Sequence, residues 1–223
     1  MNEPSAAAAP GRKIRVWDLP TRIAHWLLVA LIPTSWWAAE VAHRLDWHRW
    51  SGYAILGVVL FRLYWGLAGA ETSRFAHFVR GPGTILAYLG GRAAPRPGHN
   101  PLGALSVLAL LGLLSAQVVF GLFSVDIDGL ESGPLSDRVS FDVGRQFAEW
   151  HHLAFNLLLG LIALHLAAIV AYAIRRKNLV RPMITGRTEE PGEDIAPAPL
   201  WRLALGLVLA GGAAWLISKG LRL

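Results

Sequence analysis

The chain has 223 residues, of which 54% are hydrophobic and 16% are charged, and its mean hydropathy is +0.41. This composition is too apolar for a soluble domain of this size and predicts a membrane protein. The net charge is +6, but the basic residues lie between apolar runs, so they do not indicate a nucleic-acid-binding face. The absence of cysteine excludes disulfides, iron–sulfur clusters, thiolate-held zinc and covalently attached haem, so any metal must be held by His, Met or oxygen ligands.

Apolar segments follow one another along most of the chain. A polar lead-in, 1–14, is expected to be disordered. Each apolar segment has close to the roughly 20 residues that cross a bilayer, and their ranges are 20–40, 48–69, 101–123, 146–174 and 200–218. The sequence therefore predicts an all-α integral membrane protein, with a four-helix transmembrane bundle over 15–180. A polar linker, 181–199, separates it from one extra C-terminal transmembrane helix and tail, 200–223.

The first apolar segment resembles a secretory signal peptide in its basic flank and apolar stretch. Asp18, His25 and Pro33 argue against cleavage, and we expect a retained helix with a kink at the proline.

The distribution of Lys and Arg predicts the orientation of these helices. Fourteen lie in the N-terminal segment, the 70–99 loop and the segment 175–202, whereas six lie in the 41–49 loop, the 124–149 loop and the C-terminal tail. Cytoplasmic segments are enriched in Lys and Arg. The N-terminus is therefore expected in the cytoplasm and the C-terminus in the periplasm.

The predicted orientation places each of four histidines inside the predicted spans in one half of the membrane. His25 and His165 fall in the cytoplasmic half of the membrane, and His48 and His151 fall in the outer half. His151 and His165 are 14 residues apart, which corresponds to about 21 Å of helical rise and returns to within roughly 40° of the starting direction. Both rings should therefore point to one side of the fourth helix. His152 lies about 140° away from that side and is the weaker candidate.

The depth-matched histidines form two pairs, His25 with His165 and His48 with His151. Two imidazoles on neighbouring helices can hold an iron porphyrin between them, and a large apolar ring suits the interior of a bundle. Small residues near the ligands would let the ring approach the backbone, and the candidates are Gly52, Gly57 and Gly160. Cations near the membrane surface would pair with the propionates, and the candidates are Arg22, Arg49 and Arg62. We expect no ligand role for His43, His77 and His99, which lie in loops or at interfaces.

The sequence resembles the bacterial cytochrome b561 and nickel–iron hydrogenase b-type cytochrome group over about residues 15–180. The matching residues are "TRIAHW" at 21–26, His48 with Gly52, "WH" at 150–151 and "LH" at 164–165. The resemblance implies a four-helix bundle that holds two non-covalent haem b groups near opposite faces of the bacterial inner membrane. It assigns His25 and His165 to the inner haem and His48 and His151 to the outer haem.

The function implied is electron transfer between the quinone pool and a redox partner in a respiratory chain, with a quinone-coupled half-reaction as the only chemistry expected. A periplasmic cytochrome c or a hydrogenase or reductase subunit would suit as partner, and the net acidic 124–149 loop would steer a basic one. No catalytic side-chain arrangement and no nucleic-acid motif is present. Two alternatives stay open: a metal-ion or proton transporter lined by the same histidines, and a membrane anchor subunit of an oxidoreductase complex.

Overall fold

The computed structural model describes residues 13–92, 98–127, 132–189 and 193–222, most of which are helical. Nearly all of the predicted lead-in, 1–14, lies outside the described residues. The long helices are α1 (Leu19–Glu40), α2 (Leu45–Ala68), α5 (Pro101–Phe123), α6 (Phe141–Ile174) and α8 (Leu200–Ser218). Shorter elements connect them: β1 (Ile14–Arg15), η1 (Glu71–Ser73), α3 (Phe75–Phe78), α4 (Pro82–Leu89), η2 (Ser136–Arg138), α7 (Val180–Thr185) and β2 (Arg187–Thr188).

Four of the long helices, α2, α5, α6 and α8, are long and apolar enough to cross a membrane. α1 has 22 residues, which is a spanning length, but it is less apolar because it carries Arg22, His25 and Glu40. α6 has 34 residues and is about 51 Å long, so it extends beyond a hydrocarbon core of about 30 Å. The all-α membrane bundle predicted from the sequence is confirmed.

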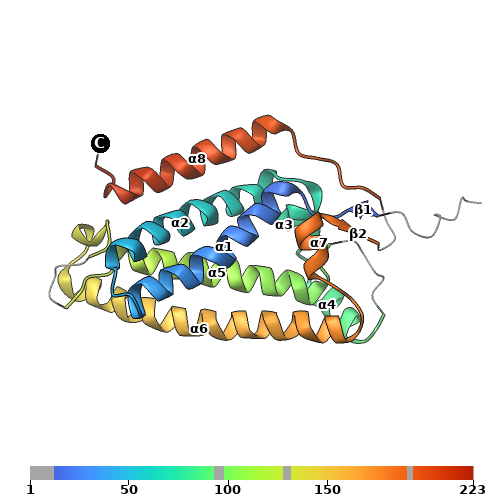
Figure 1. Ribbon diagram of the computed structural model, residues 1–223, viewed down its shortest axis with the longest axis horizontal. Coiled ribbons are helices and arrows are strands. Elements are labelled where there is room, and N and C mark those ends of the chain that lie inside the picture. The colour runs from blue at the N-terminus through green and yellow to red at the C-terminus, as the bar shows by residue number, and fades with distance from the viewer. Residues whose placement is uncertain (1–12, 93–97, 128–131, 190–192, 223) are drawn as a thin grey trace, which may run out of the picture.

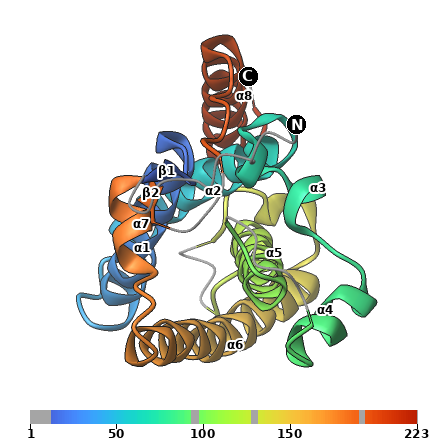
Figure 2. The same ribbon diagram turned by 90° about the vertical axis from the view of Figure 1, so that its right-hand side faces the viewer.

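The bundle consists of two helical hairpins and a fifth helix outside them. α1 packs along α2, and α5 packs along α6, while α2 and α5 join the two pairs. Figure 2 shows these four helices around a common interior, with α1 and α6 meeting little at the level of the backbone. α8 lies against the other side of α2 (Figure 1). α1 and α6 are therefore not packed along each other.

Local sequence signals explain where three of these helices begin. The side chain of Asp18 caps α1 by accepting a hydrogen bond from the Thr21 backbone N–H at 3.1 Å, and Pro20 occupies the first turn. Asn100 caps α5 through the Gly103 N–H at 2.7 Å, directly before Pro101. Ser140 caps α6. Each cap satisfies a backbone donor that the first helical turn leaves free.

The core of the bundle is an apolar layer contributed by α2, α5 and α6. Its buried residues are Ile55, Val59, Leu111, Leu114 and Leu158. Partly buried side chains from α1, among them Leu28 and Leu31, pack against this layer. The layer lies between the outer and inner ends of the helices, so it separates the two levels at which the four histidines lie.

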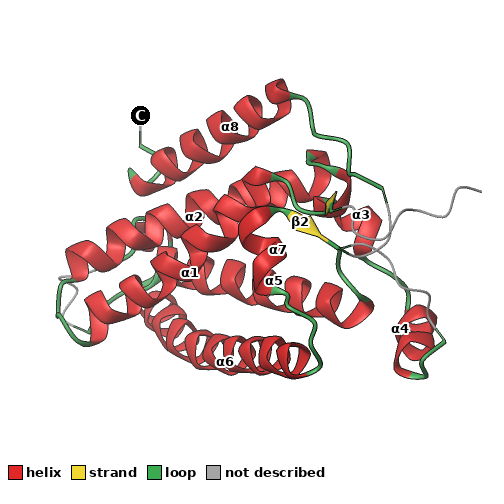
Figure 3. Cartoon of the chain, turned by 45° about the vertical axis from the view of Figure 1, so that its right-hand side comes forward, coloured by secondary structure: helices red, strands yellow, loops and turns green. Residues whose placement is uncertain are grey.

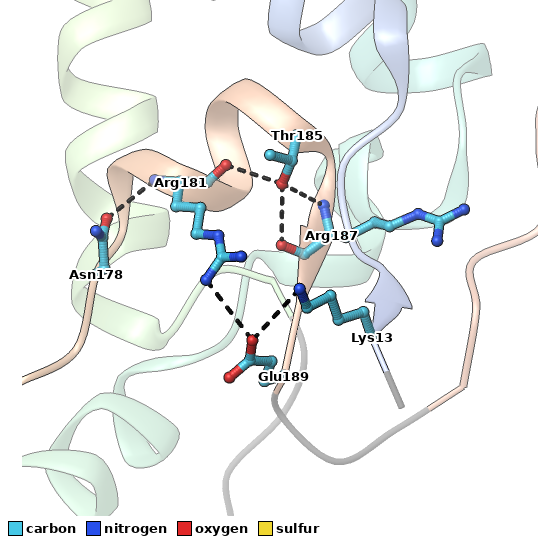
Figure 4. A network of polar contacts seen from close by, with 6 residues as sticks. All are labelled: Lys13, Asn178, Arg181, Thr185, Arg187 and Glu189. Carbon is cyan, nitrogen blue, oxygen red and sulfur yellow. Dashed lines mark hydrogen bonds and ion pairs between the residues drawn. The ribbon is translucent and has the colours of Figure 1, made fainter. Parts of the chain in front are cut away.

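The predicted linker, 181–199, contains part of α7 and all of β2. β2 pairs antiparallel with β1, with Ile14 opposite Thr188 and Arg15 opposite Arg187, and Figure 3 shows this small sheet beside the helical bundle. Glu189 lies within ion-pair distance of both Lys13, at 3.8 Å, and Arg181, at 3.7 Å (Figure 4). These contacts join the start of the chain to the segment that follows α6.

α8 is held to the bundle at both of its ends. Near its start, the Tyr64 hydroxyl donates to the Arg202 carbonyl at 3.0 Å, and Arg202 donates to the Ala68 carbonyl at 3.3 Å. Beyond its end, Arg222 forms an ion pair with Asp137 of the loop before α6. The extra helix predicted from the sequence is therefore anchored on α2 and on the loop between α5 and α6.

Candidate functional site

His48 on α2 and His151 on α6 meet in the interior of the bundle. The centroids of their rings lie 6.0 Å apart, and the ring planes are nearly perpendicular, at 87°. Both residues are half-buried. These two side chains come from helices that are far apart in the sequence, and the fold brings them together at one depth.

Each ring of the His48–His151 pair, which the sequence predicts to be the outer pair, is oriented by a backbone carbonyl. The Nδ1 atom of His48 lies 3.0 Å from the carbonyl oxygen of Ser35 and 3.1 Å from its hydroxyl, and Nδ1 of His151 lies 2.9 Å from the carbonyl oxygen of Gln117. A ring that donates through Nδ1 to a carbonyl carries its lone pair on Nε2, which is the arrangement usual for a metal-bound imidazole. The side-chain amide of Gln117 lies 3.1 Å from Nε2 of His151.

Gly121 on α5 gives the ring of His151 its space. A Cβ atom at this position would lie 2.8 Å from Cε1 of His151, which is closer than side-chain carbons approach one another. Gln117 and Gly121 are one helical turn apart, so one stretch of α5 both orients the imidazole and makes room for it.

His25 on α1 and His165 on α6 form the second level of the bundle. Both are half-buried and lie within electrostatic range of each other. Nδ1 of His25 is buried and has no hydrogen-bond partner among the described residues. A buried ring nitrogen without a partner is costly to leave in this state, so His25 is available to a ligand that the protein binds.

The remaining histidines are arranged differently. His152 is exposed, with its ring centroid 6.4 Å from that of His151, and His43 is exposed in the turn between α1 and α2. His77 lies 3.3 Å from Glu71. His99 is the one that differs from the expectation for an interface residue, because its ring lies between the rings of Trp17 and Phe78.

Residues 16–186 match the model of the family described as prokaryotic cytochrome b561. The chain belongs to this family. It is also 23% identical over 219 residues to a probable Ni/Fe-hydrogenase B-type cytochrome subunit of Cupriavidus necator, covering 81% of this chain and 90% of that protein. No solved structure matches the chain. The protein is thus a membrane b-type cytochrome of electron transfer, and its cofactor is haem b.

The histidine pairs of this cytochrome suit haem b better than a bare metal ion. A non-covalent haem needs nitrogen ligands in an apolar interior, and the rings of His48 and His151, each held through Nδ1, would fit that need. The buried Nδ1 of His25, which has no partner among the described residues, is consistent with a bound group that completes its surroundings. Among the residues that the structure describes, no three or more His, Asp or Glu side chains gather in a group that could hold a metal ion.

The three glycines predicted to let the porphyrin ring approach the helix backbone lie in different surroundings. Gly52 lies one turn after His48, and a Cβ at this position would meet no neighbouring atom within 4 Å, so it leaves space on the interior face of α2. Gly57 instead faces Ala214 of α8, 3.7 Å away, and Gly160 is exposed on α6. The prediction is wrong for Gly57, which lies nine residues after His48, a rotation of about 180°, and faces α8. For Gly160, where a Cβ would meet no atom within 4 Å, it stays a prediction.

The three arginines predicted to bind propionates lie in different surroundings. Arg49 is exposed at the outer end of α2, and Arg22 is half-buried beside Gly186, with its Nε buried and unpartnered among the described residues. Arg62 is buried on α2, where it donates a hydrogen bond to the Ser73 carbonyl at 3.3 Å. Of the three, Arg62 is the cation in the bundle interior.

Sequence reasoning missed the residues that orient the outer pair, which are Ser35, Gln117 and Gly121. Gln117 left a signal, because it is the one amide side chain in the apolar segment 101–123, and polar groups at membrane depth are usually functional. Ser35 and Gly121 left none, because small residues are common throughout transmembrane helices.

Proposed function

We propose that this cytochrome carries electrons across the bacterial inner membrane through two haem b groups, one at each histidine pair. His25 and His165 would hold the inner haem, and His48 and His151 would hold the outer one. The observation that carries the proposal is the pair of His48 and His151, two imidazoles from different helices whose ring centroids lie 6.0 Å apart and whose Nδ1 atoms are both bound to carbonyls.

The residues of the chain have separate tasks in this proposal. Haem b supplies a reversible one-electron redox centre when it is bound. Ser35 and Gln117 fix the tautomer and the orientation of the outer imidazoles, and the apolar layer around Leu111 and Leu158 excludes water between the two levels. If the two imidazoles of each pair hold a haem iron, they would leave no position on it for oxygen.

The two levels lie at opposite sides of the membrane in the proposed orientation, with the N-terminus in the cytoplasm and the C-terminus in the periplasm. His151 and His165 are on one helix with about 21 Å of rise between them. Electrons would pass between membrane quinone and a partner at the outer face. The name of the Cupriavidus relative supports a hydrogenase as that partner, and the acidic loop before α6 would equally accept a basic cytochrome c.

The first test is a count of haem in the purified, detergent-solubilised protein, combined with a reduced-minus-oxidised absorption spectrum. We expect two haem b per chain and a low-spin, six-coordinate spectrum. One haem per chain would show that one of the histidine pairs is not a site. No haem after expression with ample haem supply would favour the transporter alternative.

Single substitutions assign the ligands. We expect His48→Ala and His151→Ala each to remove the outer haem and retain the inner one, and His25→Ala and His165→Ala to do the reverse, because each iron loses one of its two axial nitrogens. His152→Ala is the matched control, since this neighbouring histidine is exposed on the same helix. Haem content and the spectrum of each variant measure the result, and loss of haem in His152→Ala with retention in His151→Ala would contradict the assignment.

A further inference from the structure

Arg62 lies on the interior side of α2, toward the cytoplasmic end in the proposed orientation. It follows His48 by 14 residues, so it is about 21 Å farther along the helix and within roughly 40° of the same direction. The residue is 8% exposed. α2 therefore carries a ligand candidate at the outer level and a buried guanidinium near the level of His25 and His165.

The charge of this guanidinium has no direct counter-ion in the described part of the chain. Its hydrogen bond to the Ser73 carbonyl is long, at 3.3 Å, and the ring centroid of Phe75 is 5.9 Å from its central carbon. Asp18 is close enough to act on it electrostatically, but the two side chains form no ion pair within 4 Å. A buried charge without a paired anion is strongly disfavoured.

Asp18 is already committed to other donors. Its carboxylate accepts hydrogen bonds from Trp65 Nε1 at 2.6 Å, from the Thr21 N–H at 3.1 Å and from the Ser73 hydroxyl at 3.2 Å. These bonds fasten the start of α1 to α2 and to the turn that follows it. The carboxylate is therefore held where it is. The Arg62 side chain has one hydrogen bond among the described residues, the one to Ser73, which leaves further N–H donors for a second anion.

His99, just before α5, is another potential donor and is near enough to Arg62 for the two side chains to interact electrostatically. Its ring lies between Trp17 and Phe78, with both centroid distances at 4.6 Å, and its Nδ1 is buried without a hydrogen-bond partner among the described residues. Burial, together with the nearby charges of Arg62 and His77, lowers the pKa of His99 to about 3. The imidazole is consequently neutral at physiological pH and has one ring N–H to donate.

We propose that Arg62 and His99 form a subsite for a carboxylate, and that a propionate of the inner haem fills it. The inference rests on the dihaem function proposed above. A carboxylate matches the planar fork of a guanidinium and balances its charge. The subsite is also at the right level, because Arg62 follows His48 on α2 by the same 14 residues by which His165 follows His151 on α6.

Potentiometric titration of the detergent-solubilised protein with both haems bound tests this subsite. Arg62→Gln should lower the midpoint potential of the inner haem and leave that of the outer haem unchanged, because loss of a nearby positive charge favours the oxidised iron. Arg62→Lys, which keeps the charge but not the fork, should lower it less. His99→Phe, which keeps an aromatic ring between Trp17 and Phe78, should also lower it. Arg74→Gln is the matched control, since Arg74 is exposed on the same side of the membrane.

A second arm distinguishes a propionate from a free anion. The potential of the inner haem in the unsubstituted protein should not change when chloride is replaced by the bulky sulfonate anion of MES at constant ionic strength, because a propionate is attached to the haem. A chloride-dependent potential that Arg62→Gln abolishes would overturn the proposal in favour of a free anion. If two haems are present and the potentials are unchanged in both Arg62→Lys and His99→Phe, the subsite is refuted and the dihaem function stands. A protein without two haems refutes that function itself.

Discussion

At the scale of single residues, the outer site depends on the absence of a side chain at Gly121. A methyl group there would lie 2.8 Å from Cε1 of His151, so Gly121→Ala must displace a ring whose Nδ1 is bound to the Gln117 carbonyl. We expect the outer haem to be retained about 10- to 100-fold less tightly, which is the usual effect of disturbing the residues that orient a ligand. Haem content after gel filtration measures this.

Gly112→Ala on the same helix is the control for that substitution. A Cβ at position 112 would meet no neighbouring atom within 4 Å, so the change adds helix propensity without a clash. Normal outer haem in Gly121→Ala, equal to that in the Gly112→Ala control, would show that the ring of His151 does not need this space.

At the scale of elements, the contact of α8 with α2 depends on Gly206 and not on the glycine pair in the middle of α8. A Cβ on Gly206 would lie 2.5 Å from Cε1 of Tyr64, whereas Gly211 and Gly212 face open space within this chain. Gly206→Val should therefore weaken the packing by about 1–3 kcal/mol, in the range of overpacked interfaces. Hydrogen exchange of the α8 amides should become faster, while the haem content stays normal because α8 lies outside the four-helix bundle.

Gly212→Val is the control for α8, because it carries the same β-branched cost within the helix and meets no neighbour. Equal exchange rates in the two variants would place the essential contacts of α8 elsewhere, at the Arg202 and Arg222 ends.

At the scale of the whole molecule, the distribution of Lys and Arg sets a direction across the membrane that labelling can test. The chain has no cysteine, so single cysteines are unambiguous reporters. Asp142→Cys at the start of α6 and Thr84→Cys in α4 both replace exposed residues without changing the number of Lys or Arg. We expect a membrane-impermeant maleimide to label the cysteine at position 142 in intact spheroplasts and that at 84 only after lysis. The opposite pattern would invert the proposed positions of the two haems.

The sequence predicted the helices because they depend on local apolar length. It predicted the pairing of His48 with His151 because the two histidines stand near the starts of helices that run in the same predicted direction. Apolar length defines each helix, and the 14-residue interval defines the common side of α6. The same counting, applied to Gly57, would have placed it opposite His48. The contacts of the Ser35 and Gln117 carbonyls with the histidine rings could not be predicted from the sequence. Such a contact depends on the relative rotation and axial shift of two helices, which no single segment encodes. The burial of His99 between Trp17 and Phe78 likewise joins three segments far apart in the sequence.

The continuity of α6 has a consequence for how this protein can change in length. One unbroken helix contains both His151 and His165, so inserting a single residue between them would turn one ring by about 100° relative to the other. An insertion of seven residues would nearly restore the direction but add about 10 Å between the two levels. The interval between the sites is therefore not continuously adjustable. Only insertions close to whole turns, of about four or seven residues, would keep both rings on one side of α6.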